Sequence, residues 1–224
     1  MNVSEAVSSR RSVRGFLPKA VDPELIRAIL SKAARAPSGG NLQPWHFYAV
    51  GGAPLAELKT IMERRVVEMP QGETPEYHVY PKGLSSPYSD RRVQFGIDLY
   101  EGHLGIQRDD KEKRGKWFER NFQFFGAPLA LFCYVDRIMG APQWSDLGMC
   151  LQNVMLLLRE AGLDSCPQEC WSMYPRTVEA VLNPPENLML FCGMSIGFAD
   201  PGDPANALVT RRAPLQDFAT FIGF

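Results

Sequence analysis

"APSGGNLQPWHFYAV", residues 36–50, reads as a helix end, a turn and a strand within one short stretch. Gly39 and Gly40 permit backbone angles that other residues avoid, and they let backbone N–H groups approach a ligand closely. Ser38, Asn41 and Gln43 add a hydroxyl and two amide groups beside them. This combination suits a flat heterocycle with several carbonyls and ring nitrogens, and a plain polar turn is the alternative.

The residues on either side of this turn predict a helix and a strand. Asp22 is a suitable N-cap, and Pro23 suits the first helical turn. Apolar side chains then recur at helical spacing until Pro37 ends the helix. Residues 45–50 are rich in aromatic side chains and predict a strand, and a second helix is expected over residues 55–67.

Two later segments predict central strands. Residues 128–136 are continuously hydrophobic, which indicates a strand buried on both faces, and residues 187–200 form another central strand. Between them, a helix from about residue 144 to residue 161 has a wide apolar stripe, and Gly162 caps its end. A helix this apolar belongs either at the centre of the fold or in a dimer interface.

The middle of the chain and its tail are less regular. Residues 70–95 contain four prolines and three tyrosines, which is typical either of a cover over a site or of a disordered segment. The charge run that opens residues 108–125 predicts a solvated helix face. The aromatic residues that follow suit either the core or the roof of an aromatic ligand, and they are Trp117, Phe118, Phe122, Phe124 and Phe125. The tail ends apolar, so we expect it to dock onto something.

Composition limits the classes of function. The 224 residues are 45% hydrophobic and 22% charged, enough for one domain over residues 1–224 or one protomer of an obligate dimer. The net charge of -1 argues against bulk electrostatic binding to nucleic acid or membrane, so any basic site must be local. With neither a membrane-length apolar run nor a signal-like N-terminus, the default expectation is a cytoplasmic location.

The cysteines and histidines form no pattern typical of a metal site. Cys166 and Cys170 lie four residues apart without a second pair or a nearby histidine, and the other cysteines lie in apolar segments. Neither a metal site nor a nucleophile–base pair is therefore expected, and the thiols are predicted to be free and buried.

The N-terminal arginines favour an anion site. Arg10, Ser12 and Arg14 alternate, so in an extended segment their side chains point the same way. Planar guanidinium groups pair well with phosphate oxygens. Because the chain lacks the glycine-rich motifs of nucleotide-binding loops, side chains would have to hold any phosphate, and Arg211 and Arg212 could complete the site if the termini meet. Ordinary exposed arginines are the alternative.

In order along the chain, these motifs resemble those of the nitroreductase family of FMN-dependent oxidoreductases. RRSVRGF (residues 10–16) is similar to the family's N-terminal FMN motif, and residues 36–50 are similar to its APSxxNxQPW signature. SCPQEC (residues 165–170) resembles the loop that faces the flavin ring. VTRRAPL (residues 209–215) resembles the segment that returns a basic residue to the phosphate. The resemblance is weakest over residues 70–125.

The resemblance implies an α+β fold, a three-layer α/β/α sandwich around a mixed, mainly antiparallel sheet. It also implies an intertwined homodimer with two FMN sites at the interface, which would bury the stripe of the helix over residues 144–161. Residues 70–125 would then be a variable, substrate-covering excursion. Residues 205–224 would form an arm that wraps around the partner subunit.

The resemblance further implies an FMN site built from four segments. The phosphate, ribityl chain and pyrimidine edge would be held by Arg10, Arg11, Ser12 and Arg14, and the ring and ribityl chain would be lined from the other side by Pro37, Ser38, Gly39 and Asn41. Backbone groups would be presented to the isoalloxazine by Pro167, Gln168 and Glu169. The phosphate site would be closed by Arg212, with or without Arg211. PQEC replaces the glutamate–glycine pair common in the family, which leaves the donor to flavin N5 open.

The implied activity is NAD(P)H-dependent nitroreduction by ping-pong two-electron transfer, in which an aromatic acceptor takes the place of the departed nicotinamide. No side chain is required as a catalyst. For a benzoate substrate, Lys82, Arg91, Arg92 or Arg120 would meet the carboxylate. Enone reduction, flavin-consuming chemistry and reductive dehalogenation, the last with Ser165 as a hydroxyl near N5, are alternatives within the family. A flavin-binding protein without turnover is a further one.

Overall fold

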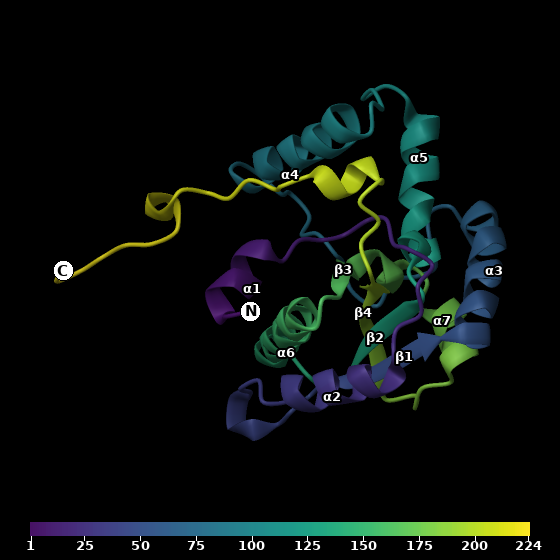
Figure 1. Ribbon diagram of the computed structural model, residues 1–224, viewed down its shortest axis with the longest axis horizontal. Helices are drawn as coiled ribbons and strands as arrows, with labels where there is room; N and C mark the ends of the chain where they lie inside the picture. The colour runs from purple at the N-terminus through teal and green to yellow at the C-terminus, as the bar shows by residue number, and fades with distance from the viewer.

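A four-stranded sheet forms the centre of the fold, and helices cover both of its faces (Figure 1). The computed structural model describes residues 1–224. The strands are β1 (His46–Gly51), β2 (Leu129–Asp136), β3 (Asp164–Gln168) and β4 (Leu188–Gly197), in the spatial order β1-β2-β4-β3. All pairs of strands in the sheet are antiparallel. The parallel component of the expected mixed sheet is limited to one isolated bridge between Ser12 and Ser165.

Helices on the two faces of the sheet form the outer layers of the predicted α/β/α sandwich. The seven helices of the chain are α1 (Val3–Ser9), α2 (Pro23–Ala33), α3 (Gly52–Glu68), α4 (Tyr88–Gly96), α5 (Lys111–Glu119), α6 (Ala141–Glu160) and α7 (Pro175–Leu182). Helix α2 begins where predicted, because the Asp22 side chain accepts a hydrogen bond from the Glu24 backbone N–H at 2.9 Å. Helices α2 and α6 pack on one face of the sheet, and α3 and α7 on the other.

Strand β2 is buried on both faces, as its continuous hydrophobicity predicts. Phe132 and Tyr134 pack into the core on the α3 side, whereas Leu131 and Cys133 pack into the core on the α2 and α6 side. Strand β4 beside it is also almost entirely buried. The two strands therefore form a rigid platform, and β3 lies at its edge.

Helix α6 lies at the centre of the fold. Its apolar stripe is buried between α2 and the sheet within a single chain, and it comprises Leu147, Cys150, Leu151, Val154, Met155 and Leu158. Of the two locations expected for this helix, the centre of the fold and a dimer interface, the structure therefore supports the centre of the fold. A dimer interface is not needed to cover the stripe, because the stripe is already covered.

The stretch over residues 70–125 is helical over much of its length. Helices α4 and α5 lie together at the top of Figure 1, joined through a π-helical segment over Ile97–His103. Phe122, Phe124 and Phe125 are buried in the core. For these three aromatic residues, the core interpretation is therefore the right one.

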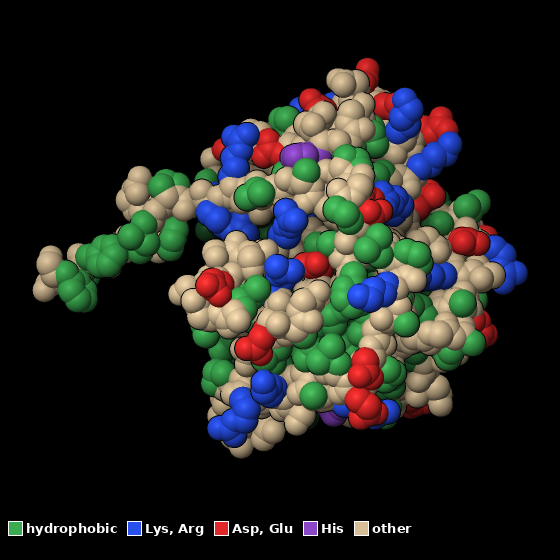
Figure 2. All heavy atoms as spheres, in the orientation of Figure 1, with side chains coloured by type: hydrophobic (Ala, Val, Ile, Leu, Met, Phe, Trp, Pro, Cys, Tyr) green, Lys and Arg blue, Asp and Glu red, His purple; other side chains and the backbone are tan.

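The C-terminal arm leaves the body of the protein (Figure 1), and Figure 2 shows a run of hydrophobic side chains along it. Phe218 is 70% exposed, and Phe224 is fully exposed. Residues 205–208 are largely buried, and Arg211 and Asp217 form ion pairs with Asp98 and Arg91, so the first part of the tail docks within the chain. Its apolar end does not. No helix of the protein combines the length and hydrophobicity that crossing a bilayer requires. All five cysteines are free, and four of them are buried.

Candidate functional site

The arginine segment, residues 10–14, runs alongside strand β3. The Val13 backbone N–H donates to the Ser165 carbonyl at 3.0 Å, next to the parallel bridge at Ser12. Arg10, Ser12 and Arg14 are partly exposed, as expected for side chains on one side of an extended segment. On the other side Val13 is fully buried, whereas Arg11 is exposed to solvent.

Residues near the C-terminus fix this segment in place. The Asn206 amide accepts a hydrogen bond from the Arg14 backbone N–H at 2.7 Å and donates one to the Gly15 carbonyl at 2.8 Å. Gly15 has no room for a side chain, because a Cβ atom there would lie 2.4 Å from Asp203. The two ends of the chain therefore meet at this point, as the arginine hypothesis requires.

The positive charges of Arg10 and Arg212, from the two ends of the chain, influence one another. Burial, and secondarily the positive charge of Arg212, lower the pKa of the Arg10 guanidinium. Neither side chain forms an ion pair with a carboxylate, and Arg212 bonds only to the Thr210 hydroxyl and to nearby backbone carbonyls. Two cations whose charges interact and that lack carboxylate partners favour the binding of an anion such as a phosphate group. Arg211 differs, because Asp98 engages it at 3.1 Å.

A cavity of about 700 Å³, called here the main cavity, opens beside Arg14. This volume is within the range of small-molecule sites. Its aromatic lining consists of Tyr77, Tyr80, Phe95, Tyr100, Trp117 and Phe118. The Arg14 guanidinium lies 5.3 Å from the centre of the Phe95 ring, so a cation sits at the edge of an aromatic-walled space. Such a space suits a flat ring with an electron-rich edge.

The end of β3 forms another wall of the main cavity through Pro167, Gln168 and Glu169. The expectation of a loop here was wrong in part, because residues 164–168 form an edge strand and a 3₁₀ helix follows it. Gln168 is buried, donating to the Asn121 carbonyl at 2.7 Å and accepting from the Ser195 hydroxyl at 2.7 Å. Its amide is thus already paired, so a ligand would meet backbone here.

The turn after α2 lies away from the main cavity. The Gly39 backbone N–H donates to the buried Asp146 carboxylate of α6 at 3.2 Å, and Asn41 is exposed in a left-handed conformation. In Figure 1 this turn lies across α6 from the arginine segment. A single chain therefore does not bring Pro37, Ser38, Gly39 and Asn41 to the other predicted residues.

The basic residues considered for a substrate carboxylate separate in the structure. Arg120 pairs with Asp203 at 2.7 Å, and Arg91 pairs with Asp217 at 3.7 Å. Arg92 is the one of the four that lines the main cavity, whereas Lys82 is exposed outside it. The aromatic lining of the main cavity could be predicted only in part from the sequence, because residues 70–125 contain many aromatic residues but no recognisable motif.

Comparison with known proteins gives a consistent picture. The sequence model of the "Nitroreductase family" matches residues 7–198. The chain is 36% identical over 220 residues to nitrobenzene nitroreductase of Ectopseudomonas oleovorans, covering 98% of this chain and 96% of that protein. It is 34% identical over 218 residues to 4-nitrobenzoate reductase of Pseudomonas putida, covering 97% and 94%.

Two solved structures are also similar. The FMN and NADPH-dependent nitroreductase NfnB from sphigopyxis sp. strain HMH superimposes with a TM-score of 0.96 and 47% identity, over the whole of both chains. The FMN-dependent nitroreductase NfnB from Mycobacterium smegmatis in complex with NADPH gives a TM-score of 0.92 and 32% identity, covering 98% of this chain and 97% of that one.

Proposed function

The chain belongs to the nitroreductase family, and on that basis we propose that it is an FMN-dependent oxidoreductase that uses NAD(P)H to reduce nitroaromatic compounds. The observation that carries the proposal is that Arg10 and Arg212, whose positive charges interact, both lack a carboxylate partner, while Arg14 of the same N-terminal segment lines the main cavity. A phosphate needs such cations, and a flat ring needs such a cavity. FMN contains both groups.

The residues present fit this cofactor, and bound FMN would supply the two-electron redox chemistry. Arg10 and Arg212 would hold the phosphate, with Ser12 beside them. Arg14 lies in the cavity wall, where its charge would stabilise negative charge on the ring's pyrimidine edge. The backbone of residues 167–169 would contact the ring from the β3 side. We assign no proton-transfer role to any side chain.

We also propose that the protein acts as a homodimer, in which the second copy completes the site. Strand β1 is an edge strand, and an apolar groove of about 950 Å³ lies between α2, β1 and α3. The exposed C-terminal arm has the hydrophobic side chains that such a groove would bury. The partner's turn over residues 37–41 would then line the cofactor. A cytoplasmic location, the default expectation from the sequence, is part of the proposal.

The dehalogenase alternative finds no support at the main cavity. Ser165, the hydroxyl that this alternative would use, is buried and does not line the main cavity. We therefore keep nitroreduction as the proposed reaction.

The test is to purify the protein and measure its absorption spectrum before and after anaerobic addition of NADPH. We expect a yellow protein whose flavin absorption is bleached. A steady-state screen of nitrobenzene, 4-nitrobenzoate, a quinone and a halophenol with both nicotinamides then identifies the acceptor class. A colourless protein that does not bind added FMN would overturn the proposal.

A further inference from the structure

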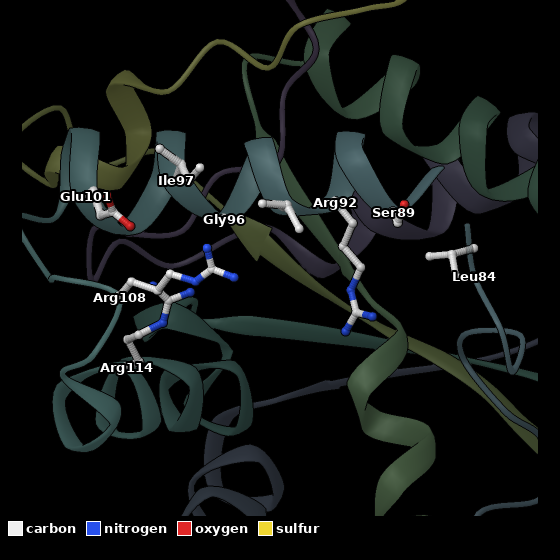
Figure 3. Close-up of a pocket in the computed structure, with 9 residues that line it drawn as sticks. Leu84, Ser89, Arg92, Gly96, Ile97, Glu101, Arg108 and Arg114 are labelled. Atoms are coloured by element: carbon white, nitrogen blue, oxygen red, sulfur yellow. The ribbon is translucent and has the colours of Figure 1, made fainter. Parts of the chain in front are cut away.

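We propose that a basic pocket beside the main cavity binds the 2′-phosphate of NADPH and makes the protein prefer NADPH over NADH. This inference rests on the proposed function. The pocket has a volume of about 280 Å³ and lies against α4 (Figure 3). Arg92 reaches it from α4, Arg114 from α5, and Arg108 from the segment that precedes α5.

The three side chains line one space. Figure 3 shows the guanidinium groups of Arg108 and Arg114 side by side, and the Arg92 side chain extends from α4 on the opposite side of the pocket. Tyrosine rings support two of these arginines: Arg114 lies 4.0 Å from the centre of the Tyr100 ring, and Arg92 lies 4.1 Å from that of Tyr80. Stacking of this kind orients a guanidinium while leaving its N–H groups free for a ligand.

The charge of the pocket is not compensated. None of the three arginines forms an ion pair, although the neighbouring Lys113 and Lys116 pair with Asp110 and Glu112. Glu101 is the one carboxylate in the lining. Three positive charges against one negative charge leave a net repulsion that a doubly charged phosphate would relieve.

The position of the pocket beside the main cavity favours a long ligand that spans both spaces. Arg92, Gly96 and Arg114 line both the pocket and the main cavity, so the two spaces adjoin. A long ligand can therefore place a ring in the main cavity and a phosphate in the pocket. NADPH has this shape, with its nicotinamide far from its 2′-phosphate. A nitrobenzoate has one negative charge on the reacting ring itself, so it would use one arginine and leave the other two unsatisfied.

The test uses the purified FMN-loaded protein, with Arg108→Gln and Arg114→Gln as variants. Lys111→Gln is the matched control, because it removes one positive charge from the same helix outside the pocket. Binding of adenosine 2′,5′-bisphosphate is measured by calorimetry, and KM is measured for NADPH and for NADH. We expect each arginine variant to lose at least tenfold in affinity for the bisphosphate and to raise KM for NADPH by a similar factor. KM for NADH and the FMN content should stay unchanged in Arg108→Gln, because Arg108 does not line the main cavity, and every value should stay unchanged in the control.

Other results separate the alternatives. Equal increases in KM for NADPH and NADH would overturn the assignment, because the pocket would then hold the pyrophosphate that both share. An increase in KM confined to 4-nitrobenzoate would overturn it in favour of a carboxylate site. Wild-type protein that does not bind the bisphosphate also refutes it, even if turnover proceeds with both nicotinamides. Failure of the proposed function is distinct, because the protein would then bind no FMN.

Discussion

Removing both arginines of the proposed phosphate site should weaken FMN binding strongly. In the double variant Arg10→Ala, Arg212→Ala, the phosphate loses two charge-assisted contacts, each worth about 1.5–3 kcal/mol. Arg10 is partly buried and belongs near the upper end of that range, whereas Arg212 is exposed and belongs near the lower end. If the two losses add, the sum is about 4.5 kcal/mol, which corresponds to a roughly 1,000-fold increase in Kd.

The assay is fluorescence titration of FMN into cofactor-free protein, with a thermal melt of each variant to check folding. Arg211→Ala is the matched control, because Asp98 already engages this exposed neighbour at 3.1 Å. Loss of a surface pair of this kind should change Kd by less than about fivefold. If the double variant binds FMN within tenfold of the wild type, the phosphate does not lie between these arginines.

Three further predictions concern the core, the arm and pH. Phe124 is fully buried and stacks on Trp171 with 4.5 Å between ring centres, so Phe124→Ala should cost about 3–5 kcal/mol in urea unfolding; a cost below about 1 kcal/mol contradicts this packing. Deletion of residues 215–224 should convert a dimer into a monomer in sedimentation, and an unchanged mass would show that the arm does not hold the dimer. Desolvation at the wall of the main cavity raises the pKa of the Glu169 carboxyl, although the residue is still exposed to solvent. The folded state therefore holds this proton more tightly than the unfolded chain, and the small resulting stability is lost as the pH rises from 4.5 through the folded pKa. Thermal melts should therefore show that Glu169→Gln loses less stability than the wild type as the pH rises above 4.5. If the melting temperatures of the two proteins change with pH in parallel, the pKa of Glu169 is not raised.

Much of the fold could be predicted because local and tertiary preferences agree. Asp22 and Pro23 start α2 where their capping chemistry places the start of a helix. The uniform hydrophobicity of β2 matches its burial on both faces. The extended path predicted for the arginine segment likewise matches its pairing with Ser165 of β3.

Strand β3 could not be predicted, because its sequence is a poor strand former. Pro167 lacks a backbone N–H, and such a residue is tolerated only where no partner strand requires that hydrogen bond. Pairing with β4 leaves β3 at the sheet edge, where that requirement is met. Tertiary pairing thus overrides local preference at the segment that lines the main cavity.

The basic pocket also could not be predicted from the sequence. Arg108 and Arg114 lie in a charge run that predicts a solvated helix face, and Lys113 and Lys116 of the same run do make solvent-exposed pairs. Only the tertiary structure places Arg108, which precedes α5, and Arg114 of α5 around one pocket with Arg92 of α4. Sequence spacing alone does not show which side chains of a charged segment face such a pocket when the apolar pattern is weak.

The most direct test of the central claim is a crystal structure of the protein with FMN bound. We predict that the phosphate lies within hydrogen-bond distance of both Arg10 and Arg212. The ring should lie in the main cavity between Arg14 and Glu169, with the partner's turn over residues 37–41 against it. A phosphate found instead among Arg92, Arg108 and Arg114, or a ring outside the main cavity, would contradict the account.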